Sequence, residues 1–266
     1  MTSKALHRSE TVLPANVPPL KKQIHVLGLS MILLIKSYFA ILNFKVSRKQ
    51  LAEQIIAVGF NTLPMVILMT IFSGMVISLE TADWLSNYGG REAVGALVTI
   101  TSVIELSPVF VSFAIGAQAG TAITAELAHM QISEQVSALR LSKVSPVNYL
   151  VAPRLLAIIY TLPLSIIIGA FFSIIGGMVI ANLLTNIEYS VFIDSAWRAL
   201  KIKDITYTLI KGFIFANYII IINTAFGLGT RGGAKDVGHM TSLSTIWMAI
   251  GIVCLDTLLD YFMYLD

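Results

Sequence analysis

Five long apolar runs dominate this chain and limit what it can fold into. Each reaches the length of about 20 residues that an α-helix needs to cross a bilayer. They cover residues 55–79, 94–125, 149–184, 205–226 and 243–265. Hydrophobic residues make up 56% of the 266 residues and charged residues only 12%, whereas charge is about a quarter of a soluble domain. The sequence therefore predicts an all-α integral membrane protein with five transmembrane helices.

A sixth apolar run, at residues 27–44, contains Lys36 and has basic residues on both sides. If it crossed the membrane, one basic cluster would lie outside, although Lys and Arg are retained on the cytoplasmic side. We therefore expect an interfacial helix within residues 24–50, with Lys36 reaching the headgroups. A sixth span is the alternative. Residues 1–23 are then a cytoplasmic tail, and residues 51–266 form one membrane domain.

The distribution of basic residues predicts the orientation. Eight of the 18 Lys and Arg residues precede Gln50, which places the N-terminus in the cytoplasm. Five crossings then place the C-terminus outside. On this topology the segments 130–147 and 227–241 are cytoplasmic.

The chain lacks the residue patterns of common catalytic and metal sites. Its one cysteine, Cys254, rules out an intrachain disulfide, and its four histidines have no metal-ligand spacing. The glycine-rich segment 227–235 fails as a phosphate loop because Lys235 precedes Asp236 instead of Ser or Thr. We expect this segment to be a tight turn. The sequence predicts no catalytic residue, no cofactor held by this chain and no metal.

The connection between the second and third spans has the pattern of a short helix near residues 133–143. Ser133 would cap it, and Glu134 and Gln135 would lie in its first turn near the positive end of the helix dipole. Leu139 would add an apolar contact, and Pro146 would end the helix before the next span. Two interpretations fit equally well: a helix shaped to dock in a partner's groove, or an ordinary solvated connection.

Charged and small residues inside the spans each allow two interpretations. Glu105, near Pro108, either faces a cavity or is a hydrogen-bonded structural carboxyl. Lys211 and Asp256 can pair inside a helix bundle, or Lys211 can reach an interface. A pair of glycines four residues apart permits close helix packing within the chain or with a second copy. These are Gly116 and Gly120.

Several motifs resemble those of one family. They are Glu105-Leu-Ser-Pro-Val109, Ala117-Gln-Ala-Gly120, Ala125-Glu-Leu-Ala-His-Met130, Glu134-Gln-Val-Ser-Ala-Leu139 and Tyr149-Leu-Val-Ala-Pro-Arg154. Together they resemble the MlaE/YrbE permeases, the membrane subunits of ABC transporters that work with MCE-domain lipid-transfer proteins. The resemblance covers nearly the whole chain beyond Gln50.

The resemblance implies a permease subunit that moves phospholipid, or a related hydrophobic lipid, between a bacterial inner membrane and an MCE-domain protein. It implies a cytoplasmic ABC ATPase that binds ATP and Mg, a second permease copy (identical or paralogous), and no nucleic-acid partner. The residues that would couple to the ATPase are Glu126, Ser133, Glu134, Gln135, Leu139 and Arg154.

A transported lipid needs an apolar slot beside a place for its headgroup. First-span residues could line such a slot, although ordinary packing explains the same spacing. The expected pocket residues are Leu63, Ile67, Thr70, Glu105, Pro108 and Gln118.

Some positions depart from the family pattern. Ile104 and Gln118 stand where the family usually has arginine, and Ser142-Lys143 replace a Met-Gly pair.

The alternatives to a lipid permease are a proton-coupled secondary transporter using Glu105, Asp256 and Lys211, and a non-transporting scaffold subunit.

Overall fold

The computed structural model describes residues 19–43, 46–87 and 90–263, and within these ranges the chain is helical with no β-strand. Most of the predicted tail, residues 1–23, lies outside the described residues. Five helical stretches are long and apolar enough to cross a membrane. They are Arg48–Leu85, Arg91–Ile132, Val147–Thr185, Ile202–Leu228 and Ala234–Met263. The predicted all-α fold with five spans is confirmed.

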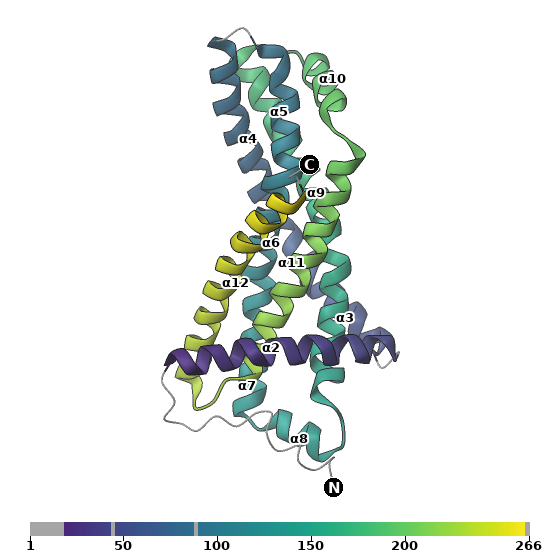
Figure 1. The fold of residues 1–266 in the computed structure, drawn as a ribbon, viewed down its shortest axis with the longest axis vertical. Coiled ribbons are helices and arrows are strands. Elements are labelled where there is room, and N and C mark those ends of the chain that lie inside the picture. Colours follow the sequence, from purple (N-terminus) through teal and green to yellow (C-terminus); the bar gives the residue numbers. More distant parts are fainter. Residues whose placement is uncertain (1–18, 44–45, 88–89, 264–266) are drawn as a thin grey trace.

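The connections between spans lie at the two ends of an elongated molecule (Figure 1). One end carries the short helix α8 (Gln135–Leu141) and the turn between α11 (Ile202–Leu228) and α12 (Ala234–Met263). We call it the elbow end. The opposite end, the far end, carries α10 (Tyr189–Ala199) and the last turn of α4 (Leu63–Asn87). The two segments predicted to share the cytoplasmic side therefore do share one end.

The N-terminal helix α2 (Pro19–Leu42) lies crosswise to the spans, near the elbow end (Figure 1). It packs against α11, where the Tyr38 hydroxyl donates a 2.7 Å hydrogen bond to Asn217 Oδ1. Burial raises the pKa of Tyr38 above its usual value, so the phenol stays a donor. The helix begins at Pro19, before the segment 24–50 that was predicted to hold the helix and its connection, and it ends at Leu42 within that segment. A separate helix, α3 (Arg48–Val58), begins the first span. Ser47, just before it, is extended, and its carbonyl accepts a hydrogen bond from Leu51 N at the start of the helix.

The first three spans are built from joined helical pieces. In the first, α3 passes through the 3-10 turn η1 (Phe60–Thr62) into α4. In the second, the pieces are η2 (Arg91–Ala93), α5 (Val94–Thr101), η3 (Ser102–Leu106), α6 (Ser107–Ile115), η4 (Gly116–Gly120) and α7 (Thr121–Ile132). In the third, η5 (Val147–Val151) leads into α9 (Ala152–Thr185). The segments η3, η4 and η5 are π-helical, and such segments are frequent at functional sites.

Prolines account for some of these irregularities. Pro108 has no N–H for the carbonyl of Ile104, four residues earlier, and the π-segment η3 lies just before it. Pro153 likewise follows η5. Pro163 lies inside α9 without interrupting it.

The longest helix connects two hydrophobic cores. With 34 residues, α9 is about 51 Å long at about 1.5 Å per residue. Its first half joins the main core, formed with α6, α7, α11 and α12 around Leu155, Ile158 and Phe215. Its last turns join a smaller core at the far end, where Phe192 of α10 packs with Val98 and Ala181. The fold is therefore continuous from the elbow end to the far end.

Small residues let α4 and α9 approach closely. A Cβ added to Gly74 would lie 1.9 Å from the carbonyl oxygen of Ser173, and one added to Gly176 would lie 2.4 Å from that of Ile71. Ser78 Oγ donates a 2.6 Å hydrogen bond to the Gly177 carbonyl across the same contact. No side chain fits between these backbones.

The predicted tight turn lies between α11 and α12. Gly232 has a φ of 109°, a conformation that residues with a Cβ rarely adopt. Asp236 accepts a 3.0 Å hydrogen bond from Gly233 N and so closes the start of α12.

We expect Gly74→Ala to destabilise the fold by about 1–3 kcal/mol, because the new methyl group collides with rigid backbone. Thermal unfolding in detergent would measure the loss. Gly238→Ala is the control, since a Cβ there meets nothing within 4 Å, and helix propensity predicts a gain of up to about 1 kcal/mol. Equal melting temperatures for both variants would contradict the close α4–α9 contact.

Candidate functional site

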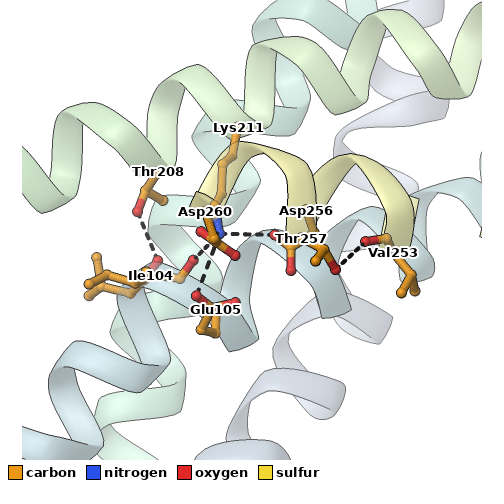
Figure 2. Close-up of polar contacts among 9 residues, drawn as sticks. Ile104, Glu105, Thr208, Lys211, Val253, Asp256, Thr257 and Asp260 are labelled. Atoms are coloured by element: carbon orange, nitrogen blue, oxygen red, sulfur yellow. Dashed lines mark hydrogen bonds and ion pairs between the residues drawn. The ribbon is translucent and has the colours of Figure 1, made fainter. Parts of the chain in front are cut away.

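A buried ammonium group and three carboxylates meet where α11, α12 and the second span come together (Figure 2). Lys211 Nζ lies 2.5 Å from Asp260 Oδ1, 2.9 Å from Asp256 Oδ1 and 3.7 Å from Glu105 Oε1. The Lys211 side chain is 1% exposed, whereas that of Glu105 is 43% exposed. We call these four residues the Lys211 cluster.

The helices position the cluster through backbone geometry. Asp256 and Asp260 lie one turn apart on the same face of α12. The carbonyl that Pro108 leaves without its usual partner, Ile104 O, accepts a 3.0 Å hydrogen bond from Lys211 Nζ. Thr208, one turn earlier on α11, donates at 2.9 Å to the neighbouring carbonyl of Val103. Two side chains of α11 therefore replace backbone bonds in the irregular part of the second span.

One of the two sequence interpretations of Lys211 is realised, since it pairs with Asp256 inside the bundle. Asp260 was missed, although its position four residues after Asp256 in an apolar run was a usable signal. Oxygens of Glu105, Asp256 and Asp260 lie within 4.8 Å of one another, a spacing that could hold a metal ion. The ammonium of Lys211 already lies among them, so the geometry is that of a salt-bridged cluster.

A second ion pair joins the two helices on either side of α8. Arg154, at the start of α9, donates through Nη2 to Glu126 Oε2 of α7 at 2.7 Å. Its Nη1 donates to the Leu150 carbonyl at 2.6 Å. The Arg154 side chain is 5% exposed and the Glu126 side chain 55% exposed. The buried guanidinium thus fixes the spacing of α7 and α9 at the elbow end.

The turn into α8 differs from the prediction. Ser133 does not cap α8, because its hydroxyl donates to the His129 carbonyl at 2.7 Å and closes α7. Glu134 is the residue before α8 and is left-handed, with a φ of 60°. Gln135 Nε2 donates back to Ser133 Oγ at 3.0 Å. The predicted capping role of Ser133 is therefore wrong. The helices α7 and α8 share a tight turn, and the Ser133 hydroxyl bonds to α7.

The apolar side of α8 faces the protein. Val136 is buried, and Leu139 packs against the main core. The outward apolar residue is Leu141, which is 85% exposed. The sequence correctly indicated an apolar helix face there. The turn geometry determines that Leu139 packs inside the protein and that Leu141 stays exposed to a partner.

The expected lipid-pocket residues are spread over the second and first spans. Pro108 and Thr70 are buried, and Thr70 lies against Gly169 of α9. Gln118 is exposed and donates to the Asn61 carbonyl at 3.1 Å, which joins the first two spans. Leu63 and Ile67 are partly exposed on the first span. The protein has one groove at the far end and another between α2 and the elbow, and neither is lined by any of these residues or by Glu105.

The glycine pair lies in the π-segment η4, where two helices of the same chain come close. A Cβ on Gly116 would lie 2.5 Å from Met248 Sδ of α12, and one on Gly120 would lie 2.7 Å from Asn223 Nδ2 of α11. Nearby, Thr124, Asn223 and Ser244 form a buried hydrogen-bonded group. The second span is therefore in tight contact with both helices.

Comparison with known families decides the identity of this arrangement. The profile described as "Permease MlaE" matches residues 51–262. This chain belongs to the MlaE permease family.

Relatives of this permease come from several lineages. A probable ABC transporter permease protein of Pyropia yezoensis is 35% identical over 84% of both chains. One of Synechocystis sp. is 30% identical, covering 85% of this chain and 86% of the relative. Protein TRIGALACTOSYLDIACYLGLYCEROL 1, chloroplastic, of Arabidopsis thaliana is 30% identical, covering 84% of this chain and 64% of that protein. The chain is a multi-pass, non-enzymatic permease subunit of an ABC transporter, a class that associates with an ATPase partner.

We expect Lys211→Met to destabilise the permease by about 3–5 kcal/mol, because it leaves three crowded carboxylates without their cation. Asp260→Asn removes one of three acidic partners and should cost less, about 1–2 kcal/mol. The matched control is Lys235→Met, at an exposed position of α12, which should stay within about 0.5 kcal/mol of the wild type. Thermal unfolding of the purified proteins gives the ranking. If Lys211→Met has the same melting temperature as the control, the cluster does not hold the three spans together.

Proposed function

We propose that this permease moves phospholipid, or a related hydrophobic lipid, between a bacterial inner membrane and an MCE-domain partner protein. ATP hydrolysis would take place on a separate cytoplasmic ATPase that holds the ATP and Mg. Membership of the MlaE family carries the proposal. The Arabidopsis relative supports a lipid cargo, because that protein is named after a glycolipid.

The elbow end has the shape that coupling to an ATPase needs. The helix α8 is exposed at Gln135 and Leu141, and Glu134 just before it is exposed as well. It is joined rigidly to the second and third spans because Arg154 binds Glu126 across its base. A force applied to α8 would therefore reach both spans. We assign the ATPase contact to Leu141 together with the turn that contains Ser133, Glu134 and Gln135, whereas Leu139 would support the helix from inside.

The proposed orientation places the elbow end and the N-terminus in the cytoplasm. The elbow connection carries Arg140 and Lys143, and the α11–α12 turn carries Arg231 and Lys235, as expected of cytoplasmic segments. The far end would then face the MCE-domain partner. There, a groove of about 910 Å³ is lined by α4, α5 and α9, with Trp84, Leu97 and Leu184 in its wall. A second permease copy, identical or paralogous, would complete the transporter.

The competing functions remain a proton-coupled transporter and a scaffold subunit. The arrangement around Lys211 suits a structural role at least as well as a proton relay. Three acceptors, one for each N–H of the ammonium, lie close to its nitrogen. Purification separates these functions. The tagged permease, taken from its native membrane in mild detergent, should carry a stoichiometric ATPase, an MCE-domain protein and enriched phospholipid, all identified by mass spectrometry. A folded, partner-free and lipid-free protein would refute the proposal.

We expect Leu141→Glu to weaken ATPase binding by about 5–30-fold, because it places a charge in the proposed apolar contact. Permease stability should change by less than about 0.5 kcal/mol, since the side chain is 85% exposed. Leu141→Met keeps the apolar surface and should bind the ATPase as the wild type does. Co-purification and ATP-dependent lipid transfer in proteoliposomes provide the readouts. Normal binding and transfer by Leu141→Glu would remove Leu141 from the interface.

A further inference from the structure

A groove of about 660 Å³ lies between α2 and the segment that runs from α8 into the third span. Its wall combines cationic and apolar side chains, and none of the described residues that line it carries a carboxylate. The lining residues are Leu29, Ile32, Leu33, Lys36, Arg140, Lys143, Val144, Ser145, Pro146, Val147 and Leu228. The cations come from both sides, Lys36 from α2 and the other two from the elbow. A ligand with a negative headgroup and a hydrocarbon part matches this division.

The two elbow cations are available to a ligand. Arg140 and Lys143 are both exposed. The salt bridges found among the described residues involve neither side chain. An anion between Lys36, Arg140 and Lys143 would therefore replace no ion pair of the two elbow residues and would gain charge-assisted contacts.

The backbone at Lys143 is unusual for a lysine. Its φ is 60°, a left-handed conformation in which a Cβ is unfavourable and which glycine adopts more easily. The turn is held by hydrogen bonds from Lys143 N to Arg140 O and from Val144 N to Leu139 O, both 3.0 Å long. These bonds need only the backbone. A lysine at this point of the turn is therefore explained by its side chain, which lines the groove.

The position of the groove favours a lipid as the source of the anion. The helix α2 lies across the spans at this level (Figure 1). Its apolar residues Met31, Ile35 and Phe39 are 64%, 54% and 62% exposed, as expected for a helix that lies in the surface of a bilayer. Leu29 and Leu33 continue this apolar character into the groove. A phosphate at the cations would thus have its acyl chain beside α2.

We propose that this groove binds an anionic phospholipid of the surrounding leaflet, with the phosphate between Lys36, Arg140 and Lys143 and an acyl chain along Leu29 and Leu33. The bound lipid bridges α2 to the elbow. It is a resident or regulatory lipid, separate from transported cargo, so the site does not depend on the proposed transport function. Anionic lipid content of the leaflet then controls how firmly the elbow is held against α2.

The test uses the full-length permease in detergent and measures bound lipid by native mass spectrometry. The probes are phosphatidylglycerol and phosphatidylcholine with identical acyl chains. We expect the wild type to prefer phosphatidylglycerol. Each cation near the membrane surface contributes about 1 kcal/mol, or roughly a fivefold change in affinity, so Arg140→Gln/Lys143→Gln should lose on the order of 25-fold in phosphatidylglycerol affinity. Lys235→Gln, with an exposed cation at the same end but outside the groove, should keep the preference.

A second variant separates binding from folding. Lys143→Gly removes the cation but suits the left-handed backbone, so its melting temperature without lipid should equal or exceed that of the wild type. It should still lose about fivefold in phosphatidylglycerol affinity.

Three results would overturn the proposal. One is an unchanged phosphatidylglycerol preference in the double variant. Another is displacement of the lipid by glycerol phosphate at equal concentration, which would show that the groove recognises a soluble anion. The third is loss of ATPase co-purification in the double variant with normal lipid binding, which would assign the groove to the partner protein.

Discussion

The central constraint of this permease is a lysine ammonium placed where water cannot solvate it. A cation buried in a membrane protein needs opposite charges and backbone acceptors within reach. Lys211 obtains them from two other segments: Asp256 and Asp260 lie on α12, while Glu105 and the carbonyl of Ile104 belong to the second span. That carbonyl is available because Pro108 cannot donate to it. The proline, the π-segment before it and the lysine therefore form one structural unit, and the positions of α11, α12 and the second span are linked through it.

A second unit, at the elbow, is linked to the first through the second span. Arg154 joins α9 to α7 at the base of α8, while the Lys211 cluster holds η3, closer to the middle of the molecule. Between these two attachments the span contains α6, the π-segment η4 and α7. Here Gly116 and Gly120 lie against α12 and α11 without room for a side chain. A displacement of α8 would therefore also shift α11 and α12. Helices packed this closely against the second span cannot move independently of it.

The sequence predicted the features that depend on composition and missed those that depend on turn geometry. Apolar length alone identified all five spans, and the cost of burying charge correctly suggested that Lys211 and Asp256 meet. The role of Ser133 was mispredicted because two helices compete for one hydroxyl, and the left-handed conformation of Glu134 decides the competition. The same turn rotates α8 so that Leu139 points inward and Leu141 outward. Asp260 was overlooked although it lies one turn after Asp256 in the same apolar run, and the packing of α11 against α12 shows that the ammonium of Lys211 reaches both carboxylates.

The elbow helix presents different chemistry on neighbouring faces. Arg140 and Leu141 are consecutive, and consecutive residues of an α-helix project about 100° apart. Arg140 lines the groove beside α2, whereas Leu141 is exposed. A protein partner on the Leu141 side and a lipid on the Arg140 side could therefore occupy α8 together without competing for one surface. If both bind, the lipid supports the side of α8 that faces the membrane while the partner pushes from the other. The stiffness of the elbow would then depend on the leaflet as well as on the protein.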